Sequence, residues 1–297
     1  SMAVKLSERG TFFLIDLFGG EIDLKDGLIR VLHDRSFVDD PCRLFRAIRF
    51  EQRFEFCMKG QTKQLMRSAI ENNLIDKLSG DRLMNEIKIL LSEADPVRCV
   101  DRMRELSLLQ TIAPEIFDDD FHWTIMKKVD SALAWAEMIP MREKPEAWFV
   151  YFHTIFMVTD DEAFEGMMMR LNFPGNIYGR MCSDRECFVE AMYDLSEERE
   201  LKPSEIYDIF SKQSSETVIL LLVACSNKRM KEYVELYFKK YCASAKIELS
   251  GDDLIGMGME PGSSFNDVFK ALRDARINGQ VTSRDEEIVL VESQFLK

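Results

Sequence analysis

The stretch that decides the fold is Asp39-Asp40-Pro41-Cys42-Arg43-Leu44-Phe45-Arg46-Ala47-Ile48-Arg49-Phe50. Aspartate followed by proline is typical of a helix start, because the carboxylate can accept from free amides and proline lacks the donor that the first helical position leaves unused. Apolar residues then recur at helical spacing on one face, while Arg43, Arg46 and Arg49 follow one another at intervals of three. The pattern predicts an amphipathic helix that Asp40 caps, with Pro41 as its first residue and a basic stripe on its outer side.

The basic stripe has two interpretations. In the plainer one, Asp40 caps the helix by turning its carboxylate to the amide of Arg43, and the arginines are solvated. In the other, the acceptors of Asp40 and the planar donor fork of Arg43 lie side by side and read the edge of a nucleobase. Cytosine and adenine each present a ring acceptor beside an exocyclic amine, whereas guanine and uracil present the reverse order. Such a pair could select C or A without a template.

The rest of the sequence predicts an all-α protein with at most one strand or hairpin near the N-terminus. Residues 11–18 are aromatic and β-branched and precede Gly19-Gly20, which is typical of a strand and a turn. No alternation of strands and helices follows. The expected helices after the basic stripe are 61–72, 81–93, 96–109, 123–140, 145–158, 160–171, 184–195, 203–212, 215–226, 228–244, a short one after Ser250, 265–278 and one that begins at Ser283.

Composition excludes several classes of function. The chain has 297 residues and a net charge of −13, which argues against a non-specific nucleic-acid coat. Charge is nevertheless segregated, since residues 41–70 hold seven basic and two acidic side chains and residues 190–208 hold two basic and seven acidic ones. The longest apolar run, 218–225, is far shorter than the ~20 residues that span a bilayer. Seven scattered cysteines without a Cys-x-x-Cys pair favour reduced thiols and a cytoplasmic location, with no membrane partner.

Residues of the kinds that carry catalysis are sparse. The three histidines, His33, His122 and His153, are isolated from one another in the sequence, and Cys182-x4-Cys187 lacks further ligands, so we expect no metal site. Gly19-Gly20 lacks the remainder of a phosphate-binding fingerprint, and no serine or cysteine stands in a nucleophile motif. These patterns identify no catalytic residue in this chain.

Four segments resemble one family, the bacterial tRNA nucleotidyltransferases and poly(A) polymerases of the class II CCA-adding type. Residues 14–30 resemble its third motif, Asp-x-x-Gly-Gly-x-x-Asp-Leu ending in Ile-Arg, and residues 37–50 resemble its fourth, Glu-Asp-x-x-Arg-x-x-Arg-Ala-x-Arg-Phe. Residues 78–86, Leu-Ser-Gly-Asp-Arg-Leu-Met-Asn-Glu, resemble the fifth, and residues 249–262 resemble the Gly-x-x-Pro-Gly turn of its tail. The fourth motif departs mildly, because Asp39 stands where the family has Glu.

The resemblance implies an elongated neck, body and tail and assigns roles to single residues. Asp40 and Arg43 would choose the base, Arg46 and Arg49 would position the triphosphate or brace the neck, and Arg82 and Glu86 would brace the neck. The implied substrates are ATP and CTP, and the implied partner is the 3′ end of tRNA or another RNA. The expected divisions are a remnant of the catalytic head at 1–24 and a neck at 25–95. A helical body at 96–245 and an RNA-binding tail at 246–297 follow.

The same resemblance implies that a catalytic head should precede the third motif, with carboxylates that hold Mg²⁺ for attack on the α-phosphate. Its motifs do not occur before residue 14. We therefore expect a C-terminal piece of a template-independent nucleotidyltransferase that adds C and/or A to tRNA 3′ ends, with room for further N-terminal domains and without activity by itself. The alternative is a non-catalytic helical domain that binds RNA or, through its acidic stretch, another protein.

Overall fold

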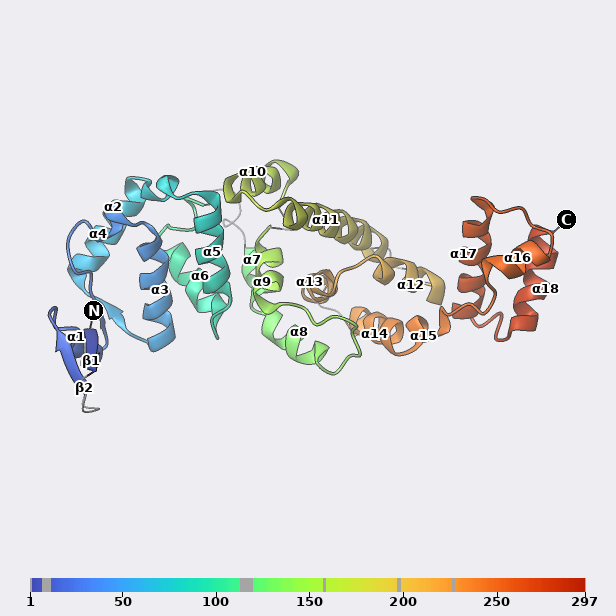
Figure 1. The fold of residues 1–297 in the computed structure, drawn as a ribbon, viewed down its shortest axis with the longest axis horizontal. Coiled ribbons are helices and arrows are strands. Elements are labelled where there is room, and N and C mark those ends of the chain that lie inside the picture. Colours follow the sequence, from blue (N-terminus) through green and yellow to red (C-terminus); the bar gives the residue numbers. More distant parts are fainter. Residues whose placement is uncertain are drawn as a thin grey trace. The chain divides into compact units, whose positions relative to one another are not determined.

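The computed structural model describes residues 2–6, 12–112, 120–156, 159–196, 199–225 and 228–296. Helices dominate this part of the chain, which confirms the all-α class (Figure 1). The chain forms two compact units, the first made of Ser1–Lys127 and Glu146–Gly179 and the second of Lys128–Pro145 and Arg180–Lys297. Each unit is described by itself below.

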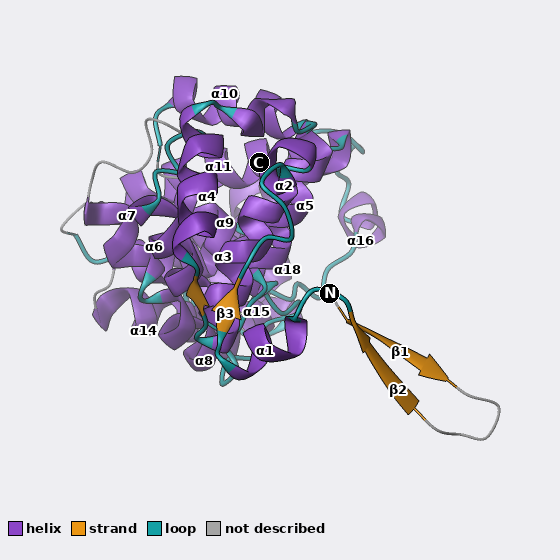
Figure 2. Ribbon diagram, turned by 90° about the vertical axis from the view of Figure 1, so that its left-hand side faces the viewer, coloured by secondary structure: helices purple, strands orange, loops and turns teal. Residues whose placement is uncertain are grey.

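The first unit begins with a hairpin. Strand β2 (Phe12–Asp16) confirms the predicted strand, and it pairs antiparallel with β1 (Met2–Leu6), so that Met2 faces Asp16. Figure 2 shows the two strands as an extended ribbon. Helix α1 (Gly20–Lys25) follows, and the Asp16 carboxylate accepts from the amides of Gly20 at 2.8 Å and Glu21 at 2.9 Å. These bonds lower the pKa of Asp16.

Helices α3 to α6 form the core that positions the basic stripe. The elements are β3 (Leu28–Ile29), α2 (Ser36–Asp39), α3 (Cys42–Phe54), β4 (Cys57–Met58), α4 (Gly60–Glu71), the 3₁₀ turn η1 (Leu74–Lys77), α5 (Gly80–Leu91) and α6 (Pro96–Glu105). Strands β3 and β4 pair in parallel, a second pairing that the sequence does not predict. The apolar faces of α3 and α5 meet, and Leu44, Ile48 and Leu83 are fully buried.

Three further helices complete the first unit. They are α7 (Asp120–Met126), α9 (Ala147–Phe156) and α10 (Asp161–Leu171). Helix α5 packs against α9 and α10 as well as α3 and α6. Helix α11 (Gly175–Ser196) carries the chain into the second unit and begins earlier than the predicted 184–195. The predicted helix 123–140 is wrong as a single element, because a turn at Lys127 and Lys128 divides it into α7 and α8 (Val129–Ala136).

Within the second unit, residues 247–296 have a core of their own and are called the tail below. Besides α8, the elements are α12 (Pro203–Ser211), α13 (Ser215–Cys225), α14 (Lys228–Leu236), the π-helical turn η2 (Tyr237–Tyr241), α15 (Cys242–Ser244), α16 (Gly251–Gly256), α17 (Ser264–Ile277) and α18 (Arg284–Phe295). The tail core is formed by the buried side chains Leu249, Leu254, Val268, Leu272 and Val291. Within the described residues, none of the helices is long and apolar enough to cross a membrane.

Candidate functional site

Helix α3 presents the predicted basic stripe on its outer side. Its inner face is anchored by Leu44, Phe45 and Ile48, which are at most 1% exposed. Arg46 on the opposite face is exposed, and Arg43 is partly exposed. Because apolar and charged residues alternate with the period of the helix, burial of the inner face directs the arginines outward.

The start of α3 differs from the prediction. The helix begins at Cys42, so Pro41 is its N-cap and not its first residue. The amide of Arg43 donates to the backbone oxygen of Asp40 at 3.1 Å, and the Asp40 carboxylate instead accepts from the amide of Cys42 at 3.3 Å. Asp40 has extended backbone angles, φ −148° and ψ 96°. The plain capping interpretation requires the Asp40 carboxylate to accept from the Arg43 amide, and the structure does not show this bond.

Asp40 lies between two guanidinium groups. Arg82 Nη2 of α5 donates to Asp40 Oδ1 at 2.8 Å. On the other side, Arg43 Nε lies 3.9 Å from Asp40 Oδ2, beyond hydrogen-bond distance but within reach of an ion pair. The Asp40 side chain is 23% exposed and that of Arg43 is 43% exposed. The structure thus brings the two predicted base-reading residues together and leaves one carboxylate oxygen facing the arginine.

Arg46 extends the same network. Its Nε and Nη2 atoms each donate to Glu86 Oε1 at 3.2 Å, and the Glu86 side chain is only 5% exposed. Arg82 and Glu86 are four residues apart on α5 and therefore share one face of that helix. Helix α5 consequently holds Asp40 with one residue and Arg46 with the other.

Arg49 belongs to a different group of charges. Its Nε lies 3.5 Å from Glu93 Oε1, which Arg53 also approaches at 3.7 Å. The Arg49 side chain is 17% exposed, and its guanidinium stands 4.9 Å from the ring centre of Phe50. The structure therefore separates Arg49 from the Asp40 network and attaches it to the segment that follows α5.

The position of α5 depends on residues that sequence reasoning missed. A Cβ atom at Gly80 would lie 2.6 Å from the backbone carbon of Leu171 and 2.7 Å from the backbone oxygen of Arg170, so the end of α10 sits directly on the first turn of α5. The Arg170 side chain donates to the backbone oxygens of Ile75 at 3.0 Å and Leu78 at 3.2 Å. No local pattern could reveal these contacts between distant segments.

A buried ion pair fixes the other end of α3. Glu51 is 6% exposed. Its Oε2 accepts from Arg102 Nε at 2.7 Å, and its Oε1 accepts from the amide of Met58 at 3.3 Å. A glutamate on the apolar face of a helix is the signal that could have identified this pair, because a buried carboxylate needs a partner.

No group of three or more His, Cys, Asp and Glu side chains that could hold a metal ion occurs in the described part of the chain. The residues there do not fit a site for Mg²⁺. The chemistry that these side chains offer is hydrogen bonding to a polar edge and attraction of an anion.

This chain is similar to several known proteins. A family model described as "Probable RNA and SrmB- binding site of polymerase A" matches residues 55–119. The chain is 34% identical to the A-adding tRNA nucleotidyltransferase of Geobacter sulfurreducens over 97% of its own length and 33% of the relative. It is 28% identical to the protein of the same name from Aquifex aeolicus, over 81% of this chain and 28% of the relative. The chain thus spans about a third of these curated relatives.

Solved structures with a similar fold are also known. A CCA-adding enzyme in complex with ATP has a TM-score of 0.80 and 28% identity, over 100% of this chain and 70% of the other. The Thermotoga maritima CCA-adding enzyme complexed with tRNA has a TM-score of 0.80 and 27% identity, over 100% of this chain and 71% of the other. The similarity therefore extends over the whole chain.

Proposed function

We propose that this chain, which belongs to the class II tRNA nucleotidyltransferase and poly(A) polymerase family, supplies base selection and RNA binding for the template-independent addition of C and/or A to tRNA 3′ ends. The observation that carries the proposal is the pairing of Asp40 with Arg43 at 3.9 Å on a partly exposed face. Relatives named for A addition and structural neighbours that hold ATP or tRNA support the substrate and the partner.

Base selection follows from the hydrogen-bonding groups of the pair. Asp40 Oδ2 would accept from the exocyclic amine of adenine or cytosine, and the Arg43 guanidinium would donate to the neighbouring ring nitrogen. Guanine and uracil would place a donor against the guanidinium and an acceptor against the carboxylate. A charged group left without its partner in a closed site costs about 1–3 kcal/mol or more, which is enough to discriminate.

Arg82 and Arg46 have distinct proposed tasks. Arg82 holds Oδ1 of Asp40, so the carboxylate keeps one orientation while Oδ2 remains directed to Arg43. Arg46 is half exposed although it donates to Glu86, and its outer donors can meet a phosphate. We assign Arg49 to bracing, since Glu93 holds it away from the pair.

The described residues supply recognition and no metal-dependent step. In a full reaction, Mg²⁺ would stabilise charge on the transferred phosphoryl group. Since the donor set for the ion is not found in the described residues, we assign this chain only binding and orientation. We expect the chain by itself to add no nucleotide to tRNA that lacks its 3′ end.

Binding of the four nucleoside triphosphates tests the proposal. The wild-type chain should bind ATP or CTP more tightly than GTP and UTP, and Asp40→Ala should remove this preference. Asp39→Ala is the matched control, because it removes a neighbouring aspartate that instead faces Arg35 at 3.4 Å. If Asp40→Ala lowers thermal stability and leaves the preference unchanged, Asp40 has only a structural role, through its bond with the Cys42 amide and its ion pair with Arg82. If the chain binds neither triphosphates nor tRNA, the alternative of a protein-interaction domain replaces this function.

A further inference from the structure

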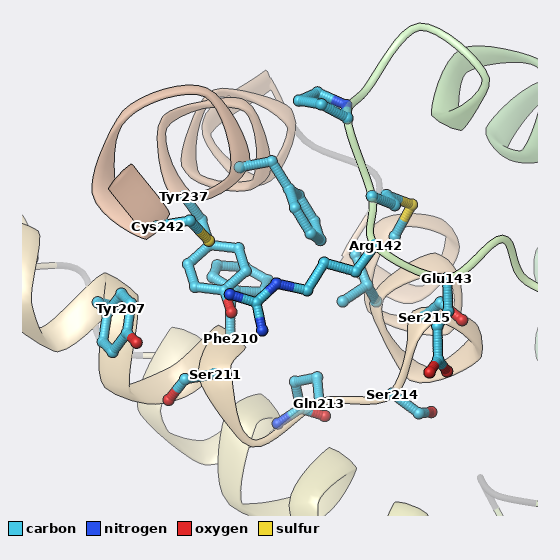
Figure 3. Close-up of a pocket in the computed structure, with 14 residues that line it drawn as sticks. Arg142, Glu143, Tyr207, Phe210, Ser211, Gln213, Ser214, Ser215, Tyr237 and Cys242 are labelled. Carbon is cyan, nitrogen blue, oxygen red and sulfur yellow. The ribbon is translucent and has the colours of Figure 1, made fainter. Parts of the chain in front are cut away.

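A cavity in the second unit has no role in base selection. It has a volume of about 350 Å³, within the range typical of small-ligand sites. Helix α12, the start of α13 and the π-helical turn η2 contribute to its wall, together with the segment at residues 140–143. Figure 3 shows the side chains that line it.

Arg142 is an exposed cation in this cavity. Figure 3 shows its side chain extended into the cavity toward the rings of Phe210 and Tyr237. Among the described residues, no carboxylate forms an ion pair with it, although most arginines of the chain have such a partner. The lining carboxylate, Glu143, lies beside Ser215 and apart from the guanidinium. The cavity therefore offers an unneutralised planar donor.

Aromatic rings form one wall. Tyr237 stands 5.6 Å from Tyr207, 5.7 Å from Phe210 and 4.8 Å from Phe238, measured between ring centres. Burial raises the pKa of Tyr237, and the neighbouring Cys242, with which its hydroxyl shares a hydrogen bond, adds to the increase. Tyr237 and Phe238 belong to the π-helical turn, a distortion that is frequent at functional sites.

Polar groups lie opposite the rings. Gln213 donates through Nε2 to the backbone oxygens of Cys187 at 3.0 Å and Ile209 at 3.2 Å, and these bonds hold its side chain in the wall of the cavity. Ser214 Oγ accepts from the amide of Thr217 at 3.2 Å and so caps α13. The hydrogen bonds of Gln213 and Ser214 therefore hold this wall of the cavity in one conformation.

We propose that this cavity binds one nucleotide, with its phosphate on Arg142 and its base against the rings of Tyr207 and Tyr237. Stacking on aromatic rings beside a basic group is how proteins hold single-stranded nucleic acid without sequence preference. A bare anion would not use the rings, and an apolar ligand would leave the guanidinium without a partner. The nucleotide could be a residue of the bound RNA or a free mononucleotide. The inference rests on the proposed function only in naming RNA as one source of the nucleotide.

Alkylation of Cys242, which lines the cavity, gives a local readout that needs no catalytic activity. Burial raises the pKa of this thiol, so alkylation is measured at about pH 9, where more thiolate is present. Peptide mass spectrometry would follow Cys242 and, as an internal control, the partly exposed Cys182 of α11. The probes are 5′-AMP, single-stranded oligo(A), inorganic phosphate and adenosine. tRNA binding by gel shift is measured in parallel.

We expect oligo(A), 5′-AMP or both to protect Cys242 and not Cys182. Protection by oligo(A) alone identifies an RNA residue, and protection by 5′-AMP identifies a free nucleotide. Arg142→Gln should weaken the protection about tenfold or more, because one charge-assisted hydrogen bond is lost. Arg229→Gln removes the same charge from an exposed residue outside the cavity and should have no such effect.

Three results would overturn the inference: no protection by either nucleotide probe, full protection in Arg142→Gln, or equal protection by inorganic phosphate alone. Retained tRNA binding without protection of Cys242 removes the cavity from RNA recognition and leaves the proposed function intact. Loss of tRNA binding by the unmodified chain counts against the proposed function instead.

Discussion

Two carboxylates of this chain, Asp40 in the first unit and Glu287 in the tail, are held in contrasting ways. Glu287 is 0% exposed and accepts from the amides of Glu248 at 3.1 Å and Leu249 at 2.9 Å, and from Arg276. Asp40 is partly exposed and accepts from Arg82 and from the amide of Cys42, with Arg43 at 3.9 Å. Both carboxylates face arginines, but only Asp40 keeps an oxygen within reach of a ligand.

The difference separates a structural pair from a binding pair. A fully buried carboxylate with all its acceptor positions used stabilises one conformation and has nothing left to bind with. A half-exposed pair contributes little to stability, since water screens it, but it can exchange its partner for a ligand. The same residue types therefore predict opposite outcomes on mutation in the two regions.

The largest effect is expected at Glu287. Glu287→Ala removes the acceptor of Arg276 Nε and of two backbone amides, while Arg276 keeps its ion pair with Glu248. Breaking a buried pair costs about 3–5 kcal/mol. The free energy of unfolding, measured with urea, should fall by about this amount, and the tail helices α16 to α18 should lose hydrogen-exchange protection. Glu292→Ala on the exposed side of α18 is the control and should change stability by less than about 0.5 kcal/mol. A loss as small as that of the control would show that Glu287 is solvated.

Gly80→Ala should have the next largest effect. The added methyl group would lie within 2.7 Å of the backbone of α10, and overpacking of this kind costs about 1–3 kcal/mol. Gly60→Ala, in which the new methyl group meets nothing within 4 Å, should be neutral or slightly stabilising, because alanine favours helix. Thermal unfolding of the two variants beside wild type measures the difference. Equal stability of both variants would place α10 away from α5.

The sequence predicts what depends on neighbours along the chain. The amphipathic face of α3, its outward arginines and the nearness of Asp40 to Arg43 follow from helical spacing alone. The resemblance added the bracing role of Arg82 and Glu86, which remains a prediction although their contacts with Asp40 and Arg46 are compatible with it. These partners are 42 and 40 residues apart, a distance that no periodicity spans.

What the sequence does not predict depends on tertiary packing. The contact between α10 and Gly80 joins segments about 90 residues apart in the sequence. The strand partner of β2 is Met2–Leu6, which is too short for its alternation of apolar and polar residues to indicate a strand. The π-helical turn at Tyr237–Tyr241 interrupts the predicted helix 228–244 without glycine or proline. Such a turn arises from the packing of its side chains and leaves no local signal.

Arg82→Gln should change binding more than stability. The Arg82 side chain is 54% exposed, so loss of its ion pair with Asp40 should lower the free energy of unfolding by at most about 1 kcal/mol. Asp40 then loses its fixed orientation, and the preference for ATP or CTP over GTP and UTP should fall. Arg98→Gln, which breaks a comparable exposed pair with Glu55 at 3.1 Å, is the control. It should lower the free energy of unfolding as much as Arg82→Gln does and keep the preference for ATP or CTP. Identical nucleotide binding in the two variants would remove Arg82 from base selection.

The smallest effect is expected from acid on the tail. Asp253 accepts from the amide of Ser250 at 2.8 Å and Glu286 from the amide of Thr282 at 2.6 Å, and these bonds lower the pKa of both carboxyls. A carboxyl with a lowered folded pKa contributes stability that is present above its unfolded value, here 4.5 for Glu286 and 3.8 for Asp253, and is lost as pH falls toward the folded value.

The contribution of these two carboxyls to the thermal stability of the tail should therefore be constant from about pH 7 to pH 5 and decline below about pH 4.5. The Asp253→Asn, Glu286→Gln double variant should start less stable at neutral pH and decline less below it. Glu286 is exposed and Asp253 is partly exposed, so the difference between the curves should be far smaller than the effect of Glu287→Ala. Parallel curves for wild type and the double variant between pH 5 and pH 3 would show that these caps do not hold the tail helices. Curves that converge in acid would show that the carboxylates at the helix starts stabilise the tail. Asp40 differs from them, because its carboxylate does not accept from the Arg43 amide at the start of α3.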